Sequence, residues 1–206
     1  MNWLAHLLLS EPTPEFRVGN LLPDLLPASD LIRLPPEFQR GIRRHLQIDS
    51  FTDSHAIVRR SIRLVSPAYR RFGGILIDMF YDHFLACDWH RYSDATIQDF
   101  SSAIYSSFES LRHDLPPTAA LRLQQIKEAD LLCSYREIDG IRRALEGIGS
   151  RLRRPVSLGE SIAQLELHYD VLHADFTEFF PKLRDYLQDE RGCVPSKTPH
   201  QRASKP

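Results

Sequence analysis

The sequence of 206 residues lacks the patterns that mark several common protein classes. Its three cysteines, Cys87, Cys133 and Cys193, lie far apart and form no C-x-x-C pair. This argues against a disulfide framework and a thiolate zinc site. No stretch approaches the roughly 20 apolar residues that a membrane-spanning helix needs, and the apolar start of the chain has no basic segment of the kind that begins a signal peptide. We therefore expect a cytoplasmic protein without a membrane span.

Familiar catalytic and nucleotide-binding motifs are also missing. The chain contains no P-loop, no G-x-G-x-x-G, no G-x-S-x-G and no H-E-x-x-H, so these ways of holding a phosphate, a serine nucleophile or a catalytic zinc are unsupported. The net charge of −1 provides no overall field for nucleic acid or an anionic membrane. We expect neither as a partner. The oligomeric state is left open.

Positive charge is nevertheless concentrated in one part of the chain. Residues 33–71 hold nine arginines against three acidic residues, a local balance of +6. The arginines are Arg33, Arg40, Arg43, Arg44, Arg59, Arg60, Arg63, Arg70 and Arg71. Such a segment either attracts an acidic macromolecule or a phosphate ester, or forms ordinary solvated helix faces. Composition alone favours neither alternative.

Hydrophobic periodicity predicts an all-α protein. Apolar residues recur every three or four positions, and alternation of period two is nearly absent. The helices are expected at residues 2–9, 21–27, 36–47, 53–65, 67–88, 94–112, 117–135, 137–150 and 158–187. Ser157 and Glu160 form a predicted capping box, and Pro181 is expected to kink or split the last helix. We predict one domain over residues 1–188 and a disordered tail over 189–206, which has no apolar periodicity.

Histidine, acidic and amide residues gather in pairs within the first 83 positions. They are His6, Asn20 with Asp24, His45 with Asp49, Asp53 with His55, and Asp78 with Asp82 and His83. Oxygen and imidazole donors without cysteine favour manganese, magnesium or iron over a structural zinc. His45 and Asp49 are four residues apart on a predicted helix, as are Asp78 and Asp82, so each pair shares one helix face. Two inward-facing pairs of this kind can form a metal site in a helical core.

Each residue taken alone also has a structural explanation. His6 suits a hydrogen-bonded core histidine, Asn20 a helix cap, and Asp24 an acid in a first helical turn. Asp53 suits the cap of the helix that follows it. The carboxylates of Asp78 and its neighbours stand among apolar residues, where an unpaired charge is expensive to bury. The group as a whole therefore predicts metal-assisted hydrolysis, with phosphoesters as the best-matched substrates.

Four phrases make the pattern specific to one family. They are MNWLAHL at 1–7, GNLLPD at 19–24, GIRRHLQIDSFTDSH at 41–55 and DMFYDHFLA at 78–86. In order and spacing over residues 1–89, they resemble the acyl carrier protein phosphodiesterases. The resemblance implies a manganese-dependent hydrolase that cleaves 4'-phosphopantetheine from a serine of holo-acyl carrier protein. It also implies an all-α helical bundle related to a distorted HD-domain fold, and Mn²⁺ as the cofactor with Mg²⁺, Fe²⁺ or Co²⁺ as substitutes.

The resemblance also implies roles for individual residues. The implied metal ligands are Asp24, His45, Asp49, Asp78 and Asp82. The residues implied to act in catalysis or beside the ligands are His6, Asn20, Asp24, His55 and His83, with Asp53 near them. The order Asp82-His83 reverses the His-Asp order of HD enzymes, so their ligand sets cannot be copied. Because Asp82 shares a helix face with Asp78, we favour that pair as ligands, and His83 or His6 as a proton donor to the seryl oxygen.

The resemblance gives the arginine-rich segment an expected partner. Acyl carrier protein is strongly acidic, so we expect a docking surface there. Its predicted residues are Arg40, Arg43, Arg44, Arg59, Arg60 and Arg63. Two alternatives stay open at this point. One is an HD-like phosphohydrolase acting on a nucleotide or alarmone, and the other is a catalytically silent all-α protein that binds an acidic partner.

Overall fold

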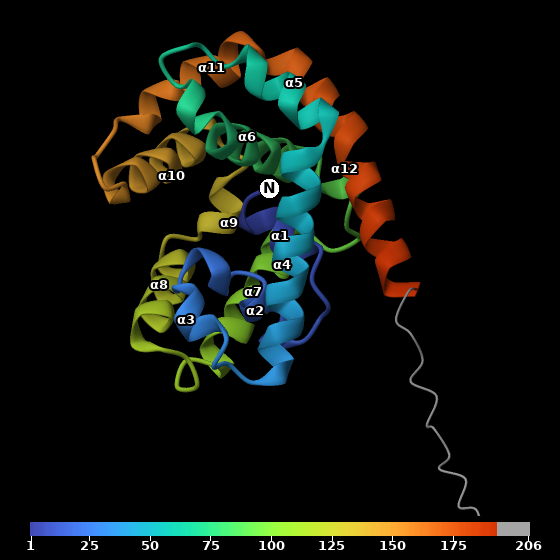
Figure 1. Cartoon of the computed structure of the whole chain (residues 1–206), viewed down its shortest axis with the longest axis vertical. Helices are drawn as coiled ribbons and strands as arrows, with labels where there is room; N and C mark the ends of the chain where they lie inside the picture. The colour runs from blue at the N-terminus through green and yellow to red at the C-terminus, as the bar shows by residue number, and fades with distance from the viewer. Residues whose placement is uncertain (193–206) are drawn as a thin grey trace, which may run out of the picture.

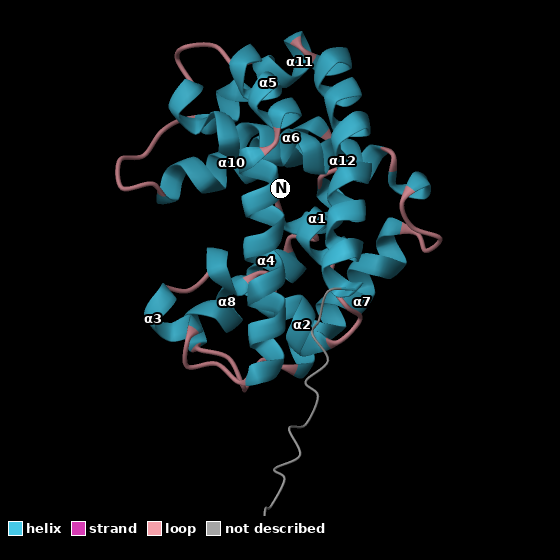
Figure 2. Ribbon diagram, turned by 45° about the vertical axis from the view of Figure 1, so that its right-hand side comes forward, coloured by secondary structure: helices cyan, strands magenta, loops and turns pink. Residues whose placement is uncertain are grey.

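The chain is represented by a computed structural model that describes residues 1–192. This part is built of α-helices and short 3₁₀ helices joined by loops, and contains no strand (Figures 1 and 2). The all-α prediction is confirmed. Within the described residues no helix combines the length and hydropathy that crossing a membrane requires.

The elements follow one another along the chain with short connections. The N-terminal ones are α1 (Trp3–Leu8), α2 (Pro14–Gly19), the 3₁₀ helix η1 (Leu22–Asp24), α3 (Ala28–Leu31), α4 (Pro36–Ser54) and α5 (Ala56–Leu64). The central ones are η2 (Arg70–Phe72), α6 (Gly73–Cys87), η3 (Trp89–Arg91), α7 (Ile97–Ser110) and α8 (Pro117–Glu128). The last ones are α9 (Leu131–Ser134), α10 (Ile138–Arg151), η4 (Leu158–Ser161), α11 (Ile162–Leu167) and α12 (Tyr169–Gly192).

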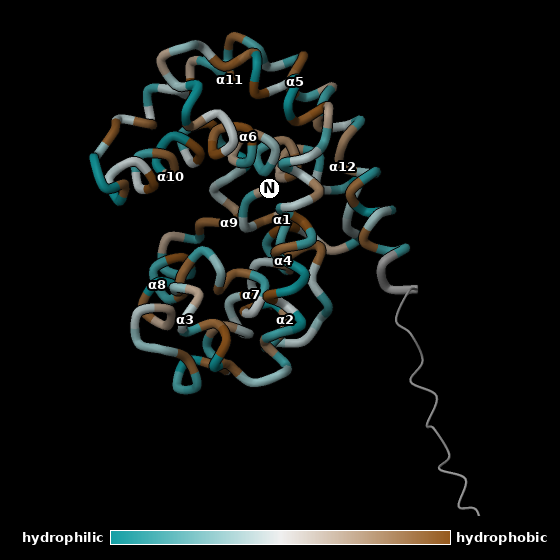
Figure 3. Tube along the Cα trace, viewed as in Figure 1, coloured by the Kyte–Doolittle hydropathy of each residue, from teal (hydrophilic) through white to brown (hydrophobic). Residues whose placement is uncertain are grey.

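Helix α6 forms the centre of the core. Nearly all of its residues from Leu76 to Ala86 are buried, and α1, α5, α10 and α12 pack against it. Most other helices alternate hydrophobic and hydrophilic residues along their length, so that one face packs inward (Figure 3). Because α6 is hydrophobic on nearly every face, it needs neighbours on several sides to bury it. One of these neighbours is α1, which carries His6.

Two glycines let α2 and α4 approach closely. A Cβ added at Gly41 would collide with the carbonyl oxygen of Phe16 and the amide of Asn20, and one at Gly19 would collide with the carbonyl of Phe38. No larger residue fits these positions without separating the helices. This close contact carries Asn20, which follows α2, up to the face of α4.

Several helix boundaries differ from the sequence prediction. The chain stays helical through the expected gap between residues 47 and 53 and breaks at His55, whose backbone is extended and whose ring caps α5 by accepting from the amide of Ile57. The expected 117–135 helix breaks before α9, where Asp130 adopts a left-handed conformation with φ 41°. Helices α2 and α3 had not been predicted, because each is too short to show periodicity.

The C-terminal part of the chain also differs from the sequence prediction. Pro181 lies inside α12 without splitting it. It is exposed, so water can reach the backbone acceptor that a proline leaves free. The break falls instead at His168, between α11 and α12. Ser157 precedes η4 but its side chain forms no cap hydrogen bond, so the predicted capping box is wrong. Helix α12 continues beyond residue 189 to Gly192, and residues 193–206 of the predicted tail lie outside the described residues.

Candidate metal-binding site

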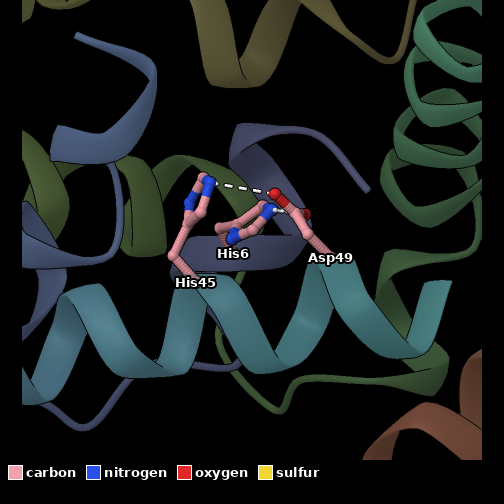
Figure 4. A group of neighbouring side chains, drawn as sticks. All are labelled: His6, His45 and Asp49. Atoms are coloured by element: carbon pink, nitrogen blue, oxygen red, sulfur yellow. Dashed lines mark ion pairs between the residues drawn. The ribbon is translucent and has the colours of Figure 1, made fainter. Parts of the chain in front are cut away.

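Three of the predicted site residues form a compact cluster. His6 comes from α1, while His45 and Asp49 lie one turn apart on α4 (Figure 4). Asp49 lies between the two rings: its Oδ1 is 3.2 Å from His6 Nε2 and its Oδ2 is 2.9 Å from His45 Nε2. The two rings stack with centroids 4.3 Å apart. The helical spacing of His45 and Asp49 therefore places both on one face, as predicted.

Asn20 orients both imidazoles from the opposite side. Its backbone carbonyl lies 2.8 Å from His45 Nδ1, and its side-chain Oδ1 lies 3.1 Å from His6 Nδ1. The amide nitrogen of Asn20 donates to the carbonyl of His6 at 2.6 Å and to Ser10 Oγ at 2.9 Å, which fixes which side of the amide faces His6. With Nδ1 of each ring next to an oxygen acceptor, the Nε2 atoms are the ones left to bind a metal ion when a ring is neutral, or to donate to Asp49 when a ring is protonated. Those are the atoms that face Asp49.

The close contacts change the acidity of Asp49 and His45. Burial alone would raise the pKa of Asp49, but its hydrogen bonds with His45 and His6 hold that pKa far below its ordinary value. Burial alone would lower the pKa of His45, but the hydrogen bond with Asp49 and the charges of Asp24 and Asp49 raise it. In the metal-free protein the cluster therefore favours an ionised Asp49 beside a protonated His45, and binding of a metal ion would release the proton of His45.

A cavity of about 260 Å³ opens beside this cluster. Asp24, Asp49 and Asp78, three of the predicted carboxylate ligands, line it. Asp24 Oδ1 lies 3.7 Å from His45 Nε2, and its other oxygen accepts a 2.8 Å hydrogen bond from the indole of Trp3. Asp78 accepts from the α-amino group of Met1 at 2.7 Å. The structure thus brings residues from α1, η1, α4 and α6 to one cavity.

Other predicted site residues lie away from this cluster. Asp82 shares the helix with Asp78 but is fully buried, and its two oxygens accept from the amides of Asn2 (3.3 Å) and Leu4 (2.7 Å) at the start of α1. Burial raises the pKa of Asp82 to about 7. Its carboxylate therefore serves the N-terminus of α1 in this structure, where such groups satisfy free amides.

The two remaining predicted histidines also face elsewhere. His83 Nδ1 is 2.9 Å from the carbonyl of Tyr135, and its Nε2 is 3.3 Å from the hydroxyl of Tyr169. Burial lowers the pKa of His83. His55 caps α5 and packs against the rings of Phe51 and Phe179. Neither ring contacts the cluster of His6, His45 and Asp49. Asp53 is exposed near the end of α4, where partial desolvation and the charges of Asp78 and Asp49 raise its pKa.

The six arginines expected to dock a partner fall into two groups. Arg40 pairs with Glu11, Arg60 pairs with Asp175 and Glu178, and Arg44 is buried with a hydrogen bond to the carbonyl of Leu187. A buried arginine cannot meet a partner from solution. The exposed arginines for which the described residues supply no ion pair are Arg43, Arg59 and Arg63.

Several residues at the cavity had not been predicted. Trp3 holds Asp24, and Arg151 at the end of α10 lines the cavity. Trp3 lies in the MNWLAHL phrase, but its residue type gave no sign of a role at the site. Arg151 follows a helix with no recognisable motif, and no local pattern relates it to α1 or α4, so only the tertiary structure reveals it.

The donor set fits a divalent cation. One ligand atom from each of His6, His45 and Asp49 lies within 4.8 Å of the others. Two metal–ligand bonds of about 2.1 Å allow donor atoms up to about 4.2 Å apart, so small side-chain rotations suffice. Two imidazole nitrogens with carboxylate oxygens suit Mn²⁺, Fe²⁺ or Co²⁺, and Asp24 is close enough to add an oxygen.

The fold and the site together define an all-α protein with a histidine–carboxylate cluster at the edge of a cavity. The family model for acyl carrier protein phosphodiesterase matches residues 1–183. A protein of Escherichia coli O45:K1 with that name is 32% identical over 186 residues, which cover 90% of this chain and 96% of the relative. The relative of the same name from E. coli K12 (DH10B) is 32% identical over 184 residues, 89% of this chain and 95% of the relative.

The chain belongs to the acyl carrier protein phosphodiesterase family. The predicted family and the predicted enzyme class, a phosphoric diester hydrolase, are thereby confirmed. No solved structure matches the chain, so the predicted relation to HD-domain folds stays a prediction.

Proposed function

We propose that this protein is a metal-dependent phosphodiesterase that hydrolyses the bond between 4'-phosphopantetheine and a serine of holo-acyl carrier protein. The observation that carries the proposal is the cluster of His6, His45 and Asp49 at a cavity lined by further carboxylates, in a chain of this family. The products are apo-acyl carrier protein and free 4'-phosphopantetheine. This substrate places the reaction in the cytoplasm.

The proposed ligands are His6, His45 and Asp49, with Asp24 as an added oxygen donor. A divalent ion held there lowers the pKa of a bound water and offsets charge on the phosphoryl oxygens. Asn20 keeps both Nε2 atoms directed to one point, and Trp3 holds Asp24 beside them. Mn²⁺ is the proposed ion, with Mg²⁺, Fe²⁺ or Co²⁺ as substitutes.

The chain supplies a cation for the phosphate as well. Arg151 lines the same cavity as Asp24, Asp49 and Asp78, and a guanidinium can hold two phosphate oxygens at once. We propose that the guanidinium of Arg151 binds the non-reacting oxygens of the phosphodiester. Asp78 stays in the proposal as a further carboxylate of the cavity, and Asp82 as the residue that positions α1 and therefore His6.

A mass-shift assay tests the reaction directly. Purified protein with Mn²⁺ is incubated with holo-acyl carrier protein, and loss of the phosphopantetheine mass is followed; a panel of nucleotides and an alarmone is assayed in parallel. We expect cleavage of the holo-protein that chelation abolishes and Mn²⁺ restores. Cleavage of a nucleotide alone would favour the HD-like alternative, and no turnover together with no bound metal would favour a silent binding protein.

The exposed arginines of α4 and α5 are the proposed docking surface for the acidic carrier protein. Arg43, Arg59 and Arg63 are exposed and can meet its carboxylates. Replacing Arg59 and Arg63 by Glu is expected to raise KM for the holo-protein about tenfold and to flatten its salt dependence, without changing metal content. The control with the same charge change is Arg112→Glu with Arg136→Glu, outside the segment. An unchanged KM in the first variant would contradict docking on this surface.

A further inference from the structure

A second cavity adjoins the candidate metal site. It has a volume of about 320 Å³ and is lined by residues of the neighbouring helices α8, α9 and α10, whose arrangement is drawn in Figure 1. Asn2, Trp3, Ile148 and Arg151 line both this cavity and the one that holds Asp24, Asp49 and Asp78. The two spaces are therefore neighbours that share a wall of four residues.

The lining of the second cavity combines apolar surface with hydrogen-bonding groups. Ile126, Leu131 and Ala144 supply apolar contacts, and the side chains of Gln125 and Ser134 supply donors and acceptors. A volume of about 320 Å³ lies within the roughly 300–1,000 Å³ of pockets that bind small organic ligands. Mixed walls of this kind suit a flexible chain that alternates methylene groups with amides.

The charge of this cavity is positive. Arg122, Arg143 and Arg151 line it, and among residues 1–192 no acidic residue does. Arg122 donates to Gln125 and lies over the ring of Trp3. Neither Arg143 nor Arg151 forms an ion pair with a residue that the structure describes. Burial and the nearby charge of Arg122 lower the pKa of Arg151, as expected for a cation without a neutralising partner.

We infer that the second cavity binds the pantetheine arm of the substrate, while its phosphate lies at the shared wall beside Arg151. This inference rests on the proposed function. The arm has an anionic phosphate at one end, a hydroxyl and two amides along its length, and a thiol at the other end. The phosphate therefore matches Arg151 at the shared wall, and the rest of the arm matches the walls of mixed polarity. The carrier protein itself needs no place in this cavity.

Gly147 allows the cavity to be filled without disturbing the fold. It lies on α10 and lines the cavity, and a Cβ there would meet only the Nη1 atom of Arg151 at 3.4 Å. Leucine at this position favours the helix more than glycine, and its side chain would occupy the space proposed for the arm. Gly74→Leu is the matched control, because a Cβ at Gly74 meets nothing within 4 Å and Gly74 lies outside both cavities. Ala144→Leu, one turn earlier on α10, is a second filling variant.

The test measures turnover and binding for the Mn²⁺-loaded full chain. Turnover is kcat/KM for holo-acyl carrier protein, and binding is the calorimetric affinity for free 4'-phosphopantetheine, with inorganic phosphate as the ligand that lacks the arm. We expect Gly147→Leu and Ala144→Leu to lower kcat/KM and the affinity for 4'-phosphopantetheine about tenfold or more. Affinity for inorganic phosphate should stay unchanged, and Gly74→Leu should behave as the parent protein does.

The possible outcomes separate this inference from the proposed function. If the parent protein cleaves the holo-protein and both filled variants match it in turnover and in binding, the inference is wrong and the proposed function stands. If the parent protein binds 4'-phosphopantetheine but cleaves no holo-protein, and the filled variants lose this binding, the proposed function is wrong and the cavity assignment stands. If phosphate binding is lost together with arm binding, the filled variants act on the phosphate site and the inference is overturned.

Discussion

Two polar clusters lie within this helical protein, and they differ in what surrounds their carboxylates. At the candidate metal site, Asp49 faces the Nε2 atoms of His6 and His45, and its side chain is 40% exposed. In the second cluster, Asp175 on α12 is 2% exposed and accepts from Arg60 Nε at 3.0 Å and from Ser61 Oγ at 2.6 Å. We call these the open cluster and the closed cluster.

The comparison shows how a ligand site differs from a structural network. In the closed cluster a carboxylate meets groups that can donate hydrogen bonds, and the hydroxyl of Tyr81 lies 2.8 Å from that of Ser61. Donors and acceptors match without a further ion. In the open cluster, Asp49 and the Nε2 atoms of two imidazoles converge beside a cavity lined by further carboxylates. Imidazole and carboxylate groups that converge on one point can share protons or exchange them for a metal ion.

Asp49→Ala gives the largest expected effect and acts on the open cluster. We expect kcat/KM for holo-acyl carrier protein to fall by at least about a hundredfold, since loss of even an outer partner of a metal ligand costs about 10–100-fold. Metal content should fall with it. Asp53→Ala, a carboxylate on the same helix, is the control. Full activity in Asp49→Ala would refute the ligand assignment.

Asp175→Ala, in the closed cluster, should lower stability and leave metal binding and activity intact, the reverse of the result expected for Asp49→Ala. Losing the charged hydrogen bonds to Arg60 and Ser61 is expected to lower the free energy of unfolding by about 2–4 kcal/mol. Denaturant titration measures this loss. The fraction that stays folded should bind Mn²⁺ and turn over substrate normally. A stable variant without activity would show that the closed cluster is functional.

Asn20→Ala tests the orientation of the imidazoles. Without its side-chain oxygen, His6 loses the partner of Nδ1, while the backbone carbonyl of residue 20 still holds His45. We expect Mn²⁺ affinity to fall about 10–100-fold, measured by calorimetry. Ser10→Ala removes a contact of the Asn20 amide and a hydrogen bond to the carbonyl of His6, but it leaves the Asn20 oxygen beside His6 Nδ1, so its Mn²⁺ affinity should fall by less. Equal effects of both variants would indicate general loosening of α1.

The smallest expected effect concerns pH in the metal-free protein. The pKa of Asp49 is lowered by its imidazole partners, so its contribution to stability is present above its unfolded value of 3.8 and is lost as pH falls. The pKa of His45 is raised, so its contribution is present below its unfolded value of 6.5 and is lost as pH rises through the folded pKa. The parent protein should therefore exceed Asp49→Ala in stability most between pH 3.8 and 6.5.

Thermal unfolding over a pH series measures this difference. Added Mn²⁺ should reverse the trend on the alkaline side, because the ion binds the deprotonated ring and its affinity rises with pH. A pH-independent difference between the two proteins would argue against coupling between Asp49 and His45.

Local spacing explains which site residues could be predicted. His45 and Asp49 are four residues apart on one helix, and this spacing brings them together whatever the rest of the chain does. Asp78 and Asp82 have the same spacing, yet Asp78 lines the cavity and Asp82 is buried at the start of α1. Spacing places residues on a face, but the neighbours packed around that face decide which of them meet solvent.

The sequence by itself determined the all-α class, the family and the ligand pair on α4, because these follow from helical periodicity, ordered motifs and local spacing. Only the tertiary structure decided the rest. The glycine contact between α2 and α4 brings Asn20 to His45, and the packing of α10 brings Arg151 to the cavity. These contacts join residues far apart in sequence, and they depend on how helix faces fit together, which no local pattern encodes.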